Sequence, residues 1–361
     1  MTFESIREKE LIHCLCGLTL SPTPSEDCLQ MVRTLDAAGR QELLELTHSH
    51  HVVIRAFEAI RNDALARGDD SMLAWADATL AAERDRIVRS LAYLEEVCNE
   101  LEAAGCPTTV IKSLDHWPDI GNDLDLYTTG NDRTVHEVMK SKFAATLEPQ
   151  SWGDRLAQKW NFKIAGLESP IEIHVQRLGQ TGEHTALARR FVTRRVQKEV
   201  GGKTFFVPAP EERIIVATLQ RMYRHFYFRV CDLVNTARMV DAGEVDFAEL
   251  QRATTPYGIW RGVATYLAIV SDYAQKFRGR PLDLPAAVTK AAICSGDKVR
   301  PRNRFLRVPI VPQCAALYSE QVTRAAFNGD VPATFRLSML PYLASAAAIT
   351  QKLTGSDKGV W

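Results

Sequence analysis

The spacing of apolar residues divides the chain into three stretches. In the first, residues 1–106, apolar residues recur at the three- and four-residue intervals of amphipathic helices. The longest predicted helix runs from about residue 69 to Gly105, where a glycine is expected to end it. Its apolar stripe consists of Ile87, Leu91, Leu94, Cys98 and Leu101. The preceding helical run, "CLQMVRTLDAAGRQELLELTHSHHVVIRAFEAIRN", is expected to break near Gly39, so the first stretch is predicted to be an N-terminal helical region.

In the second stretch, residues 107–207, the period changes to that of β-strands. "TTVIK", "DLDLYT" and "AATLEP" are predicted strands, and "DRTVHEVMKSKF" is a predicted helix. Two hairpins are expected to follow, "KWNFKIAG" with "SPIEIHVQ", and "RRVQKEV" with "KTFFVP" turning at Gly201 and Gly202. This stretch therefore predicts an α+β core with a small mixed sheet.

In the third stretch, residues 208–361, helical spacing returns and predicts a C-terminal helical domain. "PEERIIVATLQRMYRHFYFRVCDLVNTARMVDAG" is predicted to be helical, with Pro210 at its start and two glutamates in its first turn, where the helix dipole favours them. The basic run at 298–307 is expected to form a solvated loop. The predicted fold class is therefore α+β, with helical regions on both sides of the core.

Two of the predicted strands carry carboxylates on one face. Asp123 and Asp125 are two residues apart in "DLDLY", so both side chains point to the same side. In "SPIEIHVQ" the apolar residues alternate with polar ones, and Glu172 lies on the polar face. If these strands are neighbours, the three carboxylates converge into an oxygen-rich site of the kind that binds Mg²⁺ or Mn²⁺. The simpler interpretation is a solvated strand face.

The overall composition limits the possible functions only mildly. Lysine plus arginine and aspartate plus glutamate each number 44, so the chain is neutral and has no global charge signature for nucleic acid or anionic membrane. The N-terminus lacks the pattern of a secretory signal, and no apolar run is long enough to span a bilayer. The eight cysteines contain no CxxC pair, which favours reduced cysteines in a cytoplasmic protein.

The segment "VIKSLDHWPDIGNDLDLY" resembles the DNA polymerase β-like nucleotidyltransferase superfamily, and within it an uncharacterised nucleotidyltransferase family. "VIKS", the "HWPD" loop, "DLDL" and "IEIHV" correspond to successive parts of the family motif. "LLELTHSHHVVIRAF" and the helical run after the sheet resemble the flanking helices, so the resemblance covers roughly residues 30–245. It implies a polymerase β-like fold and a Mg²⁺-dependent transfer of a nucleoside monophosphate from an NTP, such as ATP, to an acceptor.

The resemblance also implies roles for particular residues. The catalytic and metal-binding residues would be Asp123, Asp125 and Glu172, with Glu172 also taking the acceptor's proton. The expected nucleotide-binding residues are Lys112, Ser113, Lys163, His174 and His225. Ser113 stands where the family has a glycine, and Asn122 and Asn235 also depart from the usual pattern. These departures leave open a catalytically inactive module that binds nucleotide or a protein partner.

Other motifs carry weaker predictions. "HSHH" at 48–51 has no evident third metal ligand, and "GGKT" is followed by a predicted strand instead of the helix that a phosphate loop needs. "RMYRHFYFR" places basic and aromatic residues on a predicted helix that could bind phosphates or simply pack in the core. The basic run at 298–307 is the most favourable place for an acidic or RNA partner. The acceptor stays open among small molecules, peptides, proteins and RNA ends, as does the oligomeric state.

Overall fold

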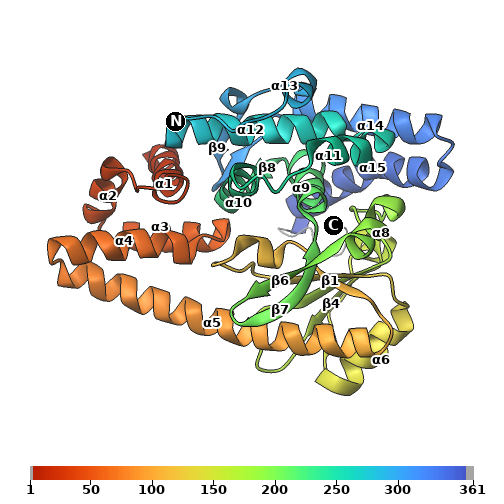
Figure 1. The fold of residues 1–361 in the computed structure, drawn as a ribbon, viewed down its shortest axis with the longest axis horizontal. Helices are drawn as coiled ribbons and strands as arrows, with labels where there is room; N and C mark the ends of the chain where they lie inside the picture. The colour runs from red at the N-terminus through yellow and green to blue at the C-terminus, as the bar shows by residue number, and fades with distance from the viewer. Residues whose placement is uncertain (1–2, 355–361) are drawn as a thin grey trace.

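The computed structural model describes residues 3–354 and has the predicted α+β class (Figure 1). Its N-terminal helices are α1 (Phe3–Thr19), α2 (Glu26–Arg33), α3 (Ala37–His50), α4 (Val53–Arg67) and α5 (Asp70–Ala103). The helix α5 is the long helix expected from the sequence, and Gly105 follows its end with a φ of 75°. In Figure 1 this helix runs from α4 beneath the sheet to α6, so one rigid rod joins the N-terminal helices to the core.

The core contains a five-stranded sheet in the order β1-β2-β5-β4-β3. Its strands are β1 (Thr108–Val110), β2 (Leu124–Thr128), β3 (Thr146–Leu147), β4 (Lys159–Lys163) and β5 (Ile171–Val175). The helices of this region are α6 (Asp132–Phe143), α7 (Trp152–Ala157) and α8 (Thr185–Thr193). The strands β2 and β5 are parallel, while the other pairs are antiparallel, so the sheet is mixed as expected. Both predicted hairpins form, the second as β6 (Arg195–Val200) and β7 (Lys203–Pro208).

The remaining chain is mainly helical and packs above the sheet in Figure 1. Its helices are α9 (Pro210–Thr218), α10 (Val230–Asp241), α11 (Phe247–Thr254), α12 (Trp260–Arg278), α13 (Ala286–Ala291), α14 (Ala315–Phe327) and α15 (Val331–Thr354). Three short strands, β8 (Tyr227–Phe228), β9 (Arg300–Arg302) and β10 (Phe305–Arg307), form a separate sheet in the order β8-β10-β9. Among residues 3–354, no helix is both long and apolar enough to cross a membrane.

The structure corrects two predictions for the third stretch. The helix expected from residue 210 to 243 is interrupted: α9 passes into a π-helical turn, Leu219–Arg224, and the chain then reverses at Phe226, whose φ is 55°. The reason is the aromatic "FYF" segment, which pairs as β8 with β10 instead of continuing the helix. The basic run at 298–307 is a hairpin, because Asn303 and Arg304 both adopt positive φ and close a two-residue turn.

The expected break near Gly39 is also misplaced. The chain leaves α2 at Thr34 and starts α3 after Asp36, whose side chain accepts a hydrogen bond from the Gly39 N–H inside the first turn of α3. Gly39 is therefore part of a capped helix start. A further break, which the sequence did not indicate, lies at His51, where φ is 51°.

Candidate functional site

The register of β2 and β5 brings the two acidic strands together. Asp125 lies directly opposite Glu172 in this parallel pair, and Tyr127 lies opposite His174. Adjacent strands are about 4.8 Å apart and alternate side chains share a face, so the two carboxylates are neighbours. The neighbouring leucines and isoleucines of both strands are fully buried on the other face, and this fixes which side the carboxylates take.

Three side chains on this face form a group that could hold a metal ion. One ligand atom from each of Asp125, Glu172 and His174 lies within 4.8 Å of the others, and all three residues are buried. The His174 Nε2 atom is 2.8 Å from Glu172 Oε1. Asp123 precedes β2 and is exposed, and it lines the same cleft as the other two acids. Two carboxylates and an imidazole suit a divalent cation.

Two lysines lie against these carboxylates. Lys112 forms an ion pair with Asp125, and its Nζ is also 3.6 Å from Glu172. Lys159 Nζ lies 3.0 Å from the other oxygen of Glu172 and 2.9 Å from Asp154. The positive charges of the two lysines thus balance the negative charges of Asp125 and Glu172.

Burial and charge shift the pKa values of the two aspartates upward. Burial raises the pKa of Asp125 well above its ordinary value, and the nearby Glu172 adds to this, while Lys112 opposes it. The pKa of Asp123 is raised as well, by partial loss of solvent and then by the charge of Glu172. Both aspartates therefore take up a proton more readily than a fully hydrated aspartate does.

Glu172 behaves in the opposite way. Burial acts to raise its pKa, but the charges of Lys159 and Lys112 and the hydrogen bond with His174 outweigh burial, so the pKa lies well below the ordinary value. Burial lowers the pKa of His174 to about 4, although its contact with Glu172 works against this. Glu172 is thus held as a carboxylate and His174 as a neutral imidazole, the forms in which both bind metals.

The backbone before β2 is strained at Lys112. This residue has φ 64° and ψ −59°, and the Ser113 N–H donates to the Ile111 carbonyl at 2.7 Å, which closes a rare and strained γ-turn. The Ser113 hydroxyl accepts from the Asp125 N–H at 2.8 Å and donates to the Asp123 carbonyl at 3.1 Å. The serine thus connects the strained turn to the backbone of both aspartates.

The chain around the π-helical turn supplies the opposite wall of a cleft of about 250 Å³. This wall is lined by Gln220, Arg221, Arg224, His225, Tyr227 and Arg229. Arg221 is neutralised by Asp232 at 2.6 Å. Within residues 3–354, neither Arg224 nor Arg229 has an acidic partner, and Arg229 instead contacts the neutral His51 at 2.5 Å. The wall therefore offers positive charge to an anionic ligand facing the carboxylates.

Most of the predicted site residues meet in this cleft. Those that line it are Lys112, Ser113, Asp123, Asp125, Glu172 and His225. His174 lies behind Glu172 and lines an adjoining cavity together with Lys112. Lys163 is not brought to the cleft: its exposed side chain pairs with Glu148 at 2.6 Å, because it lies four strand residues, about 13 Å, beyond Lys159.

Sequence reasoning gave too little weight to three residues of the cleft. Of the two lysines of β4 it named Lys163, whereas Lys159 is the one that reaches the cleft, and only the strand register separates them. It assigned Arg224 and Arg229 to one helix, whereas Arg229 is the cap residue before α10. The signal for both arginines was the basic and aromatic run itself, but the end of the helix before Phe226, where φ is 55°, is not visible in the sequence.

Comparison with known proteins bears directly on this cleft. The model of a family described as "Uncharacterised nucleotidyltransferase" matches residues 36–275, well over half of the chain. No curated protein and no solved structure matches the chain. The matched range includes both acidic strands and the arginine wall, so the resemblance seen in "VIKSLDHWPDIGNDLDLY" is confirmed. The chain belongs to the uncharacterised nucleotidyltransferase family.

Proposed function

We propose that this protein transfers a nucleoside monophosphate from an NTP to a hydroxyl group of an acceptor. The observation that carries the proposal is the pairing of Asp125 with Glu172 across β2 and β5, in one cleft with Arg224 and Arg229, which have no acidic partner within residues 3–354. One wall offers ligands for a divalent cation, and the other offers charge for a triphosphate. In the transfer, the acceptor oxygen forms a bond to the α-phosphorus while the bond to the bridging oxygen breaks, and pyrophosphate leaves with that electron pair.

The donor set fits Mg²⁺ or Mn²⁺. Asp125 and Glu172 would hold the cation, while His174 either binds it or orients Glu172, and the exposed Asp123 lines the same cleft. Nitrogen donors favour Mn²⁺ over Mg²⁺. Such a cation, when bound, neutralises phosphate charge and lowers the pKa of an acceptor hydroxyl.

The protein's own groups bind and orient the substrates. Arg224 and Arg229 would bind the triphosphate, and Lys112, released from Asp125, would contact its phosphate oxygens. The low pKa of Glu172 favours a ligand role over the base role expected from the sequence. Asp123 is the better acceptor for the hydroxyl proton, because it is exposed to the substrate and its pKa is raised.

A second function is favoured by the two lysines. Lys112 and Lys159 already neutralise Asp125 and Glu172, as they would in a relative that binds nucleotide without transferring it. Such a relative would bind NTP through its arginines without needing a divalent cation. Dependence of binding on the cation therefore separates the two functions.

The decisive experiment measures thermal stabilisation by ATP, with and without Mg²⁺ or Mn²⁺, together with pyrophosphate release. A ligand that binds only the folded state increases the free energy of unfolding, by about 2.7 kcal/mol at a concentration of 100 Kd, and so raises Tm. We expect cation-dependent stabilisation that is lost in Asp125→Asn and kept in Asp85→Asn, an exposed aspartate on α5. Equal stabilisation without any cation, and no pyrophosphate release, would favour the non-catalytic function. No stabilisation by any of the four NTPs would remove both.

A further inference from the structure

A second hollow, of about 530 Å³, is built on the hairpin β9–β10 and the segment after it. We call it the hairpin groove. Its lining consists of Phe226, Lys298, Arg300, Arg302, Asn303, Arg307, Val308, Pro309 and Ile310. Four of these side chains are cationic, and none of the described residues that line the groove is acidic. Since the chain as a whole is neutral, this is a local concentration of positive charge.

The positive charge of the hairpin groove is only weakly cancelled. Arg302 is exposed and has no acidic partner within the described chain. Arg307 is half-buried and also lacks an acidic partner there, and its guanidinium lies 4.9 Å from the centre of the Tyr227 ring. Lys298 pairs with Asp297 at 3.1 Å, but both side chains are more than half exposed, and such pairs contribute little. The groove is therefore suited to an anionic ligand.

The groove adjoins the cleft through β8. Phe226 lines the groove, and the next residue, Tyr227, lines the cleft. Arg307 of the groove is the strand partner of Tyr227, so it lies one strand spacing, about 4.8 Å, from a residue of the cleft. The cations of the groove and the arginines of the cleft thus lie on either side of one two-residue strand.

We propose that the hairpin groove binds the acceptor, and that the acceptor carries phosphate groups beside the hydroxyl that is modified. This rests on the proposed nucleotidyl transfer. Guanidinium groups bind phosphate oxygens in pairs and stay charged at every physiological pH, which suits them to hold a phosphate ester at a fixed position. Residues 298–310 lie outside the range matched by the family, so acceptor choice belongs to a part of the chain that the family does not describe.

The test uses two probes at one fixed ionic strength: a fluorescent single-stranded hexaribonucleotide with a 5′-phosphate, and a sugar bisphosphate as its competitor. The groove variant is Lys298→Glu with Arg302→Glu. The matched control is Arg84→Glu with Arg133→Glu, which makes the same change of charge at exposed positions of α5 and α6. We expect the groove variant to bind the hexanucleotide at least tenfold more weakly and the control less than twofold. The affinity for ATP with its divalent cation should be the same in all three proteins.

The outcomes distinguish the possible acceptors and the two proposals. Binding of the hexanucleotide without competition supports a nucleic acid strand, and full competition by the sugar bisphosphate supports a small phosphate ester. Equal binding by the groove variant and the parent, or no binding of either probe by the parent, overturns the proposal. If probes bind the groove but the parent binds no NTP, the acceptor role is overturned together with nucleotidyl transfer.

Discussion

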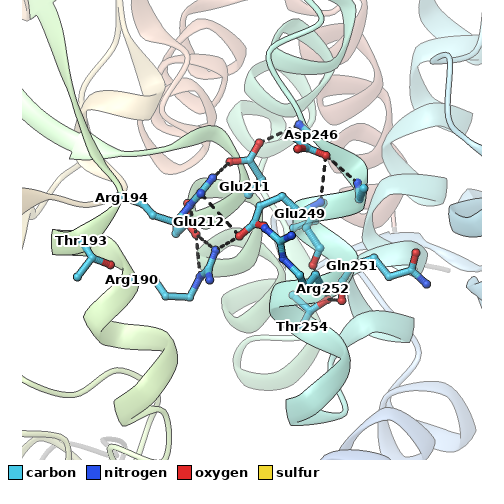
Figure 2. A network of polar contacts seen from close by, with 12 residues as sticks. Arg190, Thr193, Arg194, Glu211, Glu212, Asp246, Glu249, Gln251, Arg252 and Thr254 are labelled. Carbon is cyan, nitrogen blue, oxygen red and sulfur yellow. Dashed lines mark hydrogen bonds and ion pairs between the residues drawn. The ribbon is translucent and has the colours of Figure 1, made fainter.

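Two clusters of buried charge differ in how their charges are matched. The first is the cleft, and the second is the network of Figure 2, which joins α8, α9 and α11. In the network, Glu212 is fully buried and accepts hydrogen bonds from both Arg190 and Arg194. Glu249 forms an ion pair with Arg190, and Glu211 forms one with Arg194. Each of these three glutamates has a guanidinium partner, while Asp246 accepts from backbone N–H groups at the start of α11, and none of these residues lines the cleft.

The cleft is also rich in charged side chains, but its charges are paired differently. Asp125 and Glu172 are paired with lysines, two of the arginines have no acidic partner in the described part of the chain, and the backbone is strained at Lys112. Lysine is a flexible point charge, whereas arginine forms fixed paired hydrogen bonds, so the cleft can exchange partners and the network cannot. A dense group of charges is thus a functional candidate when its charges are unevenly matched beside a cavity, and a structural clamp when they are fully matched.

The largest expected difference between the cleft and the network is in the effect of a substitution on catalysis. Asp125→Asn should lower the rate of nucleotidyl transfer by about a thousandfold or more, because the amide keeps the shape but loses the charge that faces the cation. Glu249→Gln in the network should leave the rate within about twofold. Rates of pyrophosphate release, measured with an acceptor at saturating NTP, check both. An undiminished rate in Asp125→Asn would assign the chemistry to other residues.

The next largest difference is in stability. Glu212→Ala should lower the free energy of unfolding by about 3–5 kcal/mol, because it leaves two arginines beside a cavity without their buried partner. The affinity for ATP should be unchanged at temperatures where the variant is folded. Urea unfolding measures the loss, and the Glu212→Gln variant, which keeps the volume, serves as the control for packing. A loss below about 1 kcal/mol would show that the network is not a clamp.

Low pH should lower the free energy of unfolding through protonation of His50, the residue before His51 of the cleft lining. Burial lowers its pKa to about 3, and its two ring nitrogens contact the Arg304 carbonyl at 2.9 Å and the Val230 N–H at 3.0 Å, as a neutral imidazole does. The unfolded chain takes up this proton near pH 6.5, so the stability is fully present above that pH and is lost as pH falls towards about 3. His50→Gln should reduce the slope of the free energy of unfolding against pH, by up to about 1.4 kcal/mol per pH unit. Urea midpoints between pH 4 and 7 measure it, and an unchanged slope would contradict the assignment.

The smallest expected effect is at Ser113. Its hydroxyl is engaged by the backbone of Asp123 and Asp125, so Ser113→Ala should cost about 1 kcal/mol of stability by leaving the Asp125 N–H without its acceptor. The affinity for NTP should change less than the affinity for the divalent cation, because the aspartates lose their support first. Calorimetric titrations of the variant with each ligand give the two values. A larger loss for NTP would restore the phosphate contact expected from the sequence.

The sequence was sufficient for the parts of the molecule that repeat a local pattern. The period of apolar residues predicted α5 and both hairpins. It also predicted that Asp125 and Glu172 would meet if their strands were neighbours, and the strands are neighbours. The family resemblance added the order of these parts. The boundaries proposed at residues 106 and 207 stay a prediction.

The features that the sequence could not give depend on long-range pairing. The strand β8 exists because β10, almost eighty residues later, pairs with it, and without that partner the "FYF" segment has the pattern of a helix. The same pairing turns the basic run at 298–307 from a predicted loop into a hairpin. The exclusion of Lys163 likewise follows from where β4 is positioned in the sheet, and a strand's own residues do not determine that position.

The tight turn at Asn303 and Arg304 has a consequence for protein synthesis. The Arg304 N–H donates to Glu8 of α1, and its carbonyl contacts His50 at the end of α3, so this turn supplies partners to the first fifty residues of the chain. At a synthesis rate of about 5–20 residues per second, those partners leave the ribosome about 13–50 seconds after His50 does. The helix α1 also packs on β9 and α10. During that interval its apolar residues lack the contacts that β9 provides in the folded protein. Nascent chains stalled before residue 300 should therefore bind chaperones through their earliest helices, although those helices were made first.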